Sequence, residues 1–169
     1  RYWVLEAEVD KKISGWDKSW FLGWRDIARA TDERTVIGTL LPRVAVGNQL
    51  PLALPGATSL TQVELLQASL TSFVLDYVAR QKTGGTHLNL FVFSQLPAPR
   101  PGSTVIGLRL GRTPDSWVRY RAESLNNWSV GAMERSHLRA ELDAYCLHLY
   151  GVTREDAEYL LETFAIVKG

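Results

Sequence analysis

The segment 80–89, RQKTGGTHLN, carries the side chains of this chain that are best suited to recognise another molecule. It combines cationic, amide, hydroxyl and imidazole groups within one short stretch. Arginine and lysine bind phosphate and carboxylate groups, and adjacent glycines let a backbone approach a ligand closely. This composition favours reading a polyanion over bond-breaking chemistry. The candidate contact residues here are Arg80, Gln81, Lys82, Thr83, Thr86, His87 and Asn89.

Acidic residues near the N-terminus raise the alternative of metal-dependent nuclease chemistry. Glu6, Glu8 and Asp10 alternate along the chain and Lys12 follows. On a strand, Glu6 and Glu8 would share one face, where carboxylates can hold a divalent cation. Ion pairing at the surface is the competing interpretation, and it is the one we favour.

Other common catalytic groups lack the required spacing. The three histidines and the single cysteine, Cys146, form no zinc-binding pattern, and no phosphate-binding glycine loop or GxSxG motif occurs. Cys146 lies in an apolar, helical setting that predicts a buried structural thiol. We therefore expect no catalytic residue, no metal site and no cofactor in this chain itself.

Composition predicts an ordinary globular domain. The chain has 169 residues, of which 46% are hydrophobic and 22% charged. No apolar run approaches the roughly 18 residues of a membrane span, so we expect no membrane partner. A lone cysteine, which cannot form an internal disulfide, fits a reducing, cytoplasmic location. The only methionine is Met133, which suggests that the chain is a piece of a larger protein.

Charge is unevenly distributed, although the net charge is only +1. Between Arg80 and Arg121 there are seven basic residues and a single acid, Asp115, and acids dominate after Met133. Such asymmetry favours a face for an anionic partner. Chance fluctuation along the sequence is the alternative.

Strands are expected in the first part of the chain. Weak alternation predicts a strand over residues 2–9, and residues 20–30 and 34–41 predict a hairpin that Pro42 ends, since proline lacks a backbone donor. Residues 44–54 read as extended. Tryptophans 3, 16, 20 and 24 could stack on bases, although core packing is the commoner role.

One long helix is predicted over residues 60–78, capped by Thr58 or Ser59, because apolar residues recur at three- and four-residue steps. Left-handed glycines are expected after it, then a central strand over 88–93, a strand over 104–110 and irregular chain over 111–131. Helices follow over 132–150 and after Thr153.

These elements predict an α+β fold: a mixed β-sheet with one long packed helix and a C-terminal helical pair. We expect a single domain over residues 1–169. It would consist of an α/β recognition core over 1–131 and a helical C-terminal tail over 132–169.

Three blocks of sequence together resemble one protein family. They are FLGWRDIA, DERTVI and LPR within residues 21–43; RQ, GGTHLN and QLP within 66–97; and LRAELDAY, LYGV and FAIVK within 138–168. In order and spacing they resemble the C-terminal target-recognition region of large bacterial restriction–modification enzymes. In that family an adenine-specific DNA methyltransferase, often with an endonuclease, precedes this region on the same polypeptide. Related methyltransferases occur in phage-exclusion systems.

The resemblance implies recognition of double-stranded DNA, with the chemistry carried by other domains. The methyltransferase signature Asn-Pro-Pro-Tyr is absent, so S-adenosylmethionine and magnesium are implied for the parent enzyme alone. Arg25 and Arg43 in the first block join the DNA-binding candidates. Asn89 and Gln81 suit adenine, and cationic side chains suit guanine or phosphate. The alternative is a docking module that binds other domains of a larger protein.

Overall fold

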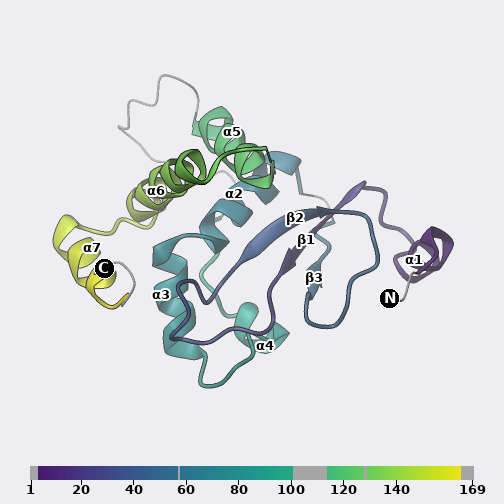
Figure 1. The fold of residues 1–169 in the computed structure, drawn as a ribbon, viewed down its shortest axis with the longest axis horizontal. Coiled ribbons are helices and arrows are strands. Elements are labelled where there is room, and N and C mark those ends of the chain that lie inside the picture. The colour runs from purple at the N-terminus through teal and green to yellow at the C-terminus, as the bar shows by residue number, and fades with distance from the viewer. Residues whose placement is uncertain (1–3, 57, 101–113, 128, 165–169) are drawn as a thin grey trace.

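The computed structural model describes residues 4–56, 58–100, 114–127 and 129–164. Over these ranges the chain forms a small three-stranded sheet and seven helices, which confirms the α+β class (Figure 1). The elements are α1 (Glu6–Lys12), β1 (Trp20–Trp24), β2 (Gly38–Pro42), β3 (Leu52–Ala53), α2 (Leu60–Leu70), α3 (Phe73–Lys82), α4 (Leu90–Phe93), α5 (Pro114–Asn126), α6 (Ala132–Leu149) and α7 (Arg154–Glu162).

The sheet has β1 at its centre, between β2 and β3. Both described pairings are antiparallel, with Trp20 opposite Pro42 and Leu22 opposite Ala53. The predicted antiparallel pairing of these two segments is therefore confirmed, and Pro42 ends β2 as expected. The strands are shorter than predicted, because residues 25–37 form a long connection in place of a tight turn. The sheet is not mixed, because β3 also pairs antiparallel with β1, on the side away from β2. Of the residues 44–54 that were expected to be extended, only Leu52–Ala53 form a strand.

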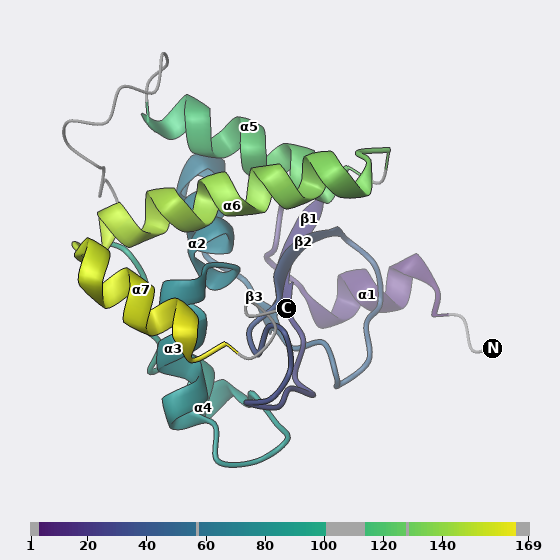
Figure 2. The same ribbon diagram turned by 60° about the vertical axis from the view of Figure 1, so that its left-hand side comes forward.

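Helices α5 and α6 lie side by side next to α2, whereas α1 lies apart from the other helices near the N-terminus (Figure 2). Helix α2 contacts β2, and α5 and α6 pack across α2, while α7 packs on α3. Three clusters of buried side chains form the core. The first, at the sheet, includes Leu22, Trp24 and Leu75. The second, between α2, α5 and α6, includes Trp117, Tyr145 and Cys146, and the third, beside α3, includes Val74, Leu160 and Phe164. The expectation of a buried Cys146 is confirmed.

The strand expected over residues 2–9 was wrong, since helix α1 begins at Glu6. None of the residues of α1 is buried, so no packing against a sheet stabilises an extended conformation there. Acidic side chains in the first turn and lysines in the last turn complement the helix dipole.

The single long helix predicted over residues 60–78 is two helices. Ser59 begins α2 with a capping box, and the second helix begins at its own cap, Ser72, whose hydroxyl accepts from Leu75 N at 3.4 Å. Between them the Thr71 hydroxyl donates to the Ala68 carbonyl at 2.9 Å. Adjacent hydroxyl side chains compete with the helix for backbone groups, which explains the break.

The buried strand expected over residues 88–93 is instead the short helix α4. Leu88 is buried, but Leu90 and Phe91 are 67% and 74% exposed. Asn89 caps this turn, because its side-chain oxygen accepts from Val92 N at 3.0 Å. A short apolar run does not by itself distinguish strand from helix, and here the cap decides.

Residues 114–126 form helix α5, where irregular chain was expected. Proline at its first position suits a helix start.

The two C-terminal helices are confirmed: Gly151 follows α6 with a φ of 68°, and Thr153 caps α7 by accepting from Asp156 N at 3.1 Å. The expected strand over 104–110 lies outside the described residues. Helix α6 packs against α2, α3 and α5.

Candidate nucleic-acid interface

The loop after α3 is docked against the chain that leaves β1. Ala28 N donates to the Thr86 carbonyl at 3.0 Å, and Leu88 N donates to the Asp26 carbonyl at 2.6 Å. The Trp24 indole closes the contact by donating to the Leu88 carbonyl at 2.8 Å. Neither glycine of the loop has a positive φ, so the left-handed backbone expected there was wrong. The loop is held in place by these backbone bonds.

Arg80 supports the fold and does not face a ligand. Its side chain is 11% exposed and pairs with the buried Asp76 carboxylate at 3.0 Å. The guanidinium also donates to the Asp32 and Glu33 carbonyls and lies 4.0 Å from the Phe164 ring centre. Burial raises the pKa of Asp76, while its bonds from Val36 N and Arg80 oppose that rise. Arg80 therefore fixes the turn at residues 32–33 and is not available to DNA.

The other loop candidates divide into scaffold and surface. Thr83 is buried and Asn89 is the α4 cap, so both serve the fold. Gln81, Lys82, Thr86 and His87 are exposed. Of these, Lys82 Nζ lies 3.5 Å from Gln95 Oε1, and His87 Nδ1 lies 2.6 Å from Asp26 Oδ2.

The two candidates from the first sequence block lie at different places. Arg43 pairs with Asp10 at 2.6 Å and so ties the sheet to α1. Arg25 pairs with Asp32 at 2.8 Å and donates to the Arg34 carbonyl at 2.8 Å. It also lines a hollow on the molecular surface.

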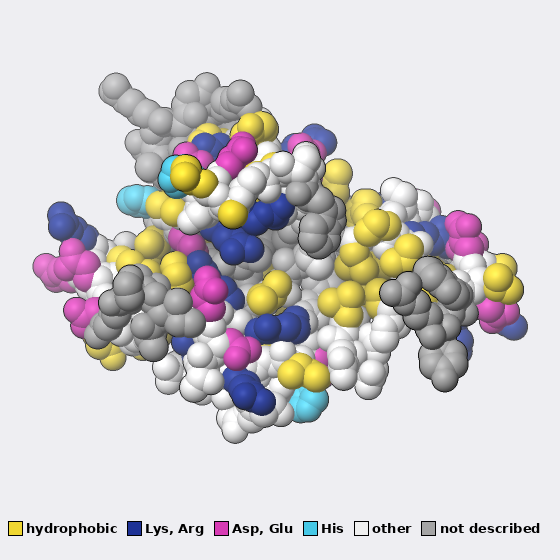
Figure 3. All heavy atoms as spheres, viewed as in Figure 1, with side chains coloured by type: hydrophobic (Ala, Val, Ile, Leu, Met, Phe, Trp, Pro, Cys, Tyr) yellow, Lys and Arg dark blue, Asp and Glu magenta, His cyan; other side chains and the backbone are white. Residues whose placement is uncertain are grey.

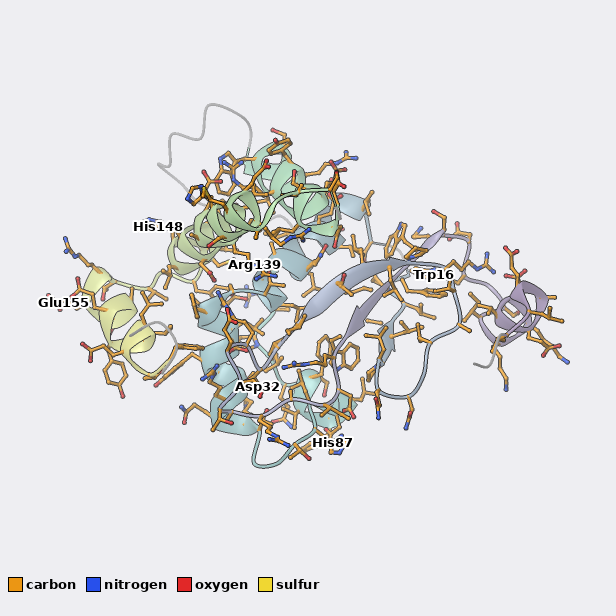
Figure 4. All side chains as sticks on the ribbon, in the orientation of Figure 1. Trp16, Asp32, His87, Arg139, His148 and Glu155 are labelled. Atoms are coloured by element: carbon orange, nitrogen blue, oxygen red, sulfur yellow. The ribbon has the colours of Figure 1, made fainter. Side chains whose placement is uncertain are left out.

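The arginine hollow is a cavity of about 410 Å³ lined by Arg25, Arg34, Arg139, Asp32 and Glu33, among others. A second hollow of about 590 Å³ adjoins it and shares Glu33, Arg34 and Arg139 with it. Lysine and arginine side chains gather in the hollowed centre of this face (Figure 3). Arg139 of α6 and Asp32, which both line the arginine hollow, are labelled in Figure 4.

Arg34 is the anchor of the arginine hollow. Its guanidinium meets the Asp143 carboxylate through bonds of 2.7 and 3.4 Å, and it lies 3.3 Å from the Phe73 ring centre. Asp143 also accepts from Phe73 N at 2.7 Å. Burial raises the pKa of Asp143, and the Arg34 guanidinium opposes the rise. The pair holds the residue 25–37 connection against α6.

Helix α6 contributes two arginines, Arg135 and Arg139, which lie one turn apart and both line the second hollow. Arg135 donates to the Leu125 carbonyl and, at 2.8 Å, to the Asn127 carbonyl. Arg139 is exposed and has no hydrogen bond or ion pair with any described residue. Sequence reasoning missed both, as well as Arg34, because they lie in or near acid-rich stretches. Their four-residue spacing was the available signal.

The basic excess between Arg80 and Arg121 does not form one cationic face in the described part of the chain. Arg119 pairs with Glu123 at 2.9 Å, and Arg121 pairs with Glu141 at 2.8 Å. Arg109 and Arg112 lie outside the described residues. The cationic surface arises from other arginines, which distant segments bring together.

The shared strand face that the nuclease alternative requires for Glu6 and Glu8 is absent. Glu6 and Glu8 lie on helix α1, where residues two apart point in different directions. Among the described residues no group of three or more histidine, cysteine, aspartate or glutamate side chains could hold a metal ion.

Of tryptophans 16, 20 and 24, two pack in the interior and Trp20 is half-buried. Trp16 meets Trp20 edge to face at 5.4 Å, and Trp24 stacks on Phe93 at 3.7 Å. Both Trp16 and Trp24 are buried. They form no stripe for stacking on bases, and Trp3 lies outside the described residues.

Comparison with protein-family models, with curated proteins and with solved structures gives no match for this chain. In the described part of the chain, no helix combines the length and the apolar character needed to cross a membrane.

Proposed function

We propose that this chain is a DNA target-recognition domain of a restriction–modification enzyme. It would grip double-stranded DNA and position it for adenine methylation or cleavage by other domains of the same cytoplasmic polypeptide. S-adenosylmethionine and magnesium would belong to those domains. The resemblance of the three sequence blocks supplies the enzyme class, and the arginine hollow supplies the physical means of binding.

The observation that carries the proposal is the convergence of arginines from two distant segments on one hollowed face. Arg25 and Arg34 come from the connection between β1 and β2, and Arg139 comes from α6. Asp32 and Asp143 hold the first two in place, so little side-chain freedom is lost when an anion binds. Phosphate contacts of this kind position a protein on DNA, whereas sequence is read by side chains at base edges.

Base reading would fall to the exposed part of the docked loop. Gln81, Thr86 and His87 remain exposed there. Because backbone bonds hold this loop against residues 26–28, its side chains are presented from a fixed support. Amide, hydroxyl and imidazole groups can pair with base edges in the major groove.

Titration of a labelled 20-base-pair duplex at several salt concentrations tests the proposal. We expect binding at low salt that weakens steeply as salt rises, with a slope of about 0.9 in log affinity against log salt for each phosphate contacted. Absence of binding at low salt would contradict the proposal.

A docking module is the second candidate, and one observation favours it. Leu90 and Phe91 of α4 are largely exposed, and Ile27, which is 42% exposed, pairs with His87 just before this helix. Exposed apolar side chains close together are typical of protein interfaces. Two results together would favour this candidate. The chain would fail to bind duplex DNA, and Phe91→Ser would make the isolated chain more soluble than the wild type.

A further inference from the structure

We propose that the arginine hollow is a binding site for a single phosphate group and that Arg139 is its main phosphate contact. The proposal deepens the DNA-binding function above, and its duplex measurements rest on that function. Phosphate is the shared chemistry of a free anion and of a DNA backbone, so both are used as probes.

The three arginines of the hollow differ in how much of their bonding capacity is already used. Arg34 is committed to Asp143 and to the Thr71 carbonyl, and its side chain is 16% exposed. Arg25 is held by Asp32, yet its Nε is buried without a partner among the described residues. A buried guanidinium donor without a partner is costly, and this one is not accessible to a ligand in the hollow.

Arg139 differs from both, because it reaches the hollow from α6 without any hydrogen bond or ion pair to the described residues (Figure 4). No described residue therefore takes up any of its donors. A guanidinium presents its N–H groups in a planar fork that matches two phosphate oxygens. Arg25 and Arg34 line the same hollow from fixed positions, but each is already paired with a carboxylate, so Arg139 carries the charge left for an anion.

The size of the hollow agrees with an ion of this class. About 410 Å³ is larger than one phosphate group requires, which leaves room for the group to remain attached to a nucleic-acid backbone.

The carboxylate of Glu33 also lines the hollow and is exposed, so it opposes an anion. Removing that charge should strengthen binding, which a merely structural role of the hollow does not predict.

The first experiment follows the arginine Nε–H signals by NMR while inorganic phosphate is added to the whole chain. We expect the Arg139 signal to move and saturate, and the signal of Arg154, which is exposed on α7, to stay nearly unchanged. Glu33→Gln should shift the titration to lower phosphate concentration. Equal movement of both arginine signals, or no movement of the Arg139 signal, would overturn the proposal.

The second experiment compares Arg139→Ala with Arg154→Ala in the duplex titration. Both variants remove one exposed positive charge, so they control for net charge. Arg139→Ala should lower the salt slope by about 0.9 and weaken binding several-fold at low salt, whereas Arg154→Ala should not. Identical behaviour of the two variants in a chain that binds duplex would refute the phosphate site and leave the proposed function standing. Conversely, a saturating Arg139 response to inorganic phosphate without duplex binding would refute the proposed function and leave the site standing.

Discussion

The guanidinium of Arg34 and the carboxylate of Asp143 form a two-bond ion pair that joins the connection between β1 and β2 to helix α6. The side chains are only 16% and 10% exposed, and Asp143 also fixes the start of α3 by accepting from Phe73 N at 2.7 Å. One carboxylate therefore joins three segments of the chain. The arginine hollow depends on this junction, because it is lined both by Arg34 of the β1–β2 connection and by Arg139 of α6.

Removing one partner of this pair should destabilise the fold. A buried charge left without its partner typically costs 3–5 kcal/mol, so Asp143→Ala should lower the free energy of unfolding by about 3 kcal/mol. Urea denaturation followed by circular dichroism measures the change. Glu158→Ala is the control, since it breaks the exposed pair with Arg154 and should cost less than about 1 kcal/mol. Similar losses for the two variants would contradict a buried anchor.

The buried Glu64 should make stability depend on pH. Burial raises its pKa from 4.5 to about 7, Arg119 partly opposes this, and Glu123 adds to it. Since the folded state then holds the proton more tightly than the unfolded state, the free energy of unfolding should fall as pH rises from about 4.5 to 7.

Glu64→Gln should remove that fall and stabilise the protein at pH 8 by about 1–3 kcal/mol. Thermal unfolding of the wild type and the variant at pH 5 and pH 8 measures this change in stability. Glu162→Gln, at an exposed position, is the matched control. A Glu64→Gln variant with the same pH dependence as the wild type would show that Glu64 titrates normally.

Asn89 should matter for stability and not for sequence preference. Its side chain caps α4 through Val92 N at 3.0 Å, and loss of such a cap costs about 1 kcal/mol. Asn89→Ala should therefore lower the melting temperature by a few degrees and leave the preferred DNA site unchanged, whereas Asn48→Ala, in an exposed loop, should do neither. Relaxed preference at one base pair in a binding-site selection would restore Asn89 as a reader of bases.

Gly38 should not tolerate a side chain. A Cβ at this position would lie 3.0 Å from the Cβ and Cδ1 atoms of Leu70, at the contact between β2 and α2. Gly38→Ala should destabilise the protein by about 1–3 kcal/mol through overpacking. Chemical denaturation compares it with Gly47→Ala, where nothing lies within 4 Å of the added atom. Unchanged stability of Gly38→Ala would mean that the contact opens at little cost.

Local signals in the sequence predicted those elements whose ends carry their own chemistry. The α2 cap at Ser59, the stop at Gly151 and the Thr153 cap of α7 were all readable from short-range patterns. The break at Ser72 and the turn begun by Asn89 depended on side-chain bonds to the backbone, which hydrophobic periodicity does not report.

The candidate site was only partly predictable for a different reason. Arg25 was named from its sequence block, but Arg34 and Arg139 are separated by more than a hundred positions and meet only because α6 packs beside the β1–β2 connection. Arg80 was misjudged because its carboxylate partner, Asp76, is a helical neighbour whose burial the sequence did not reveal. Positive charge on its own does not distinguish a ligand contact from an ion pair of the interior.

Amide chemical-shift mapping with a 20-base-pair duplex tests the central claim, that this chain binds DNA through the face of the arginine hollow. The account predicts that the largest shifts occur at residues 25–34, 81–87 and 135–139 and that they vanish at high salt. Shifts centred on Leu90, Phe91 and Ile27, or no salt-dependent shifts at all, would contradict it.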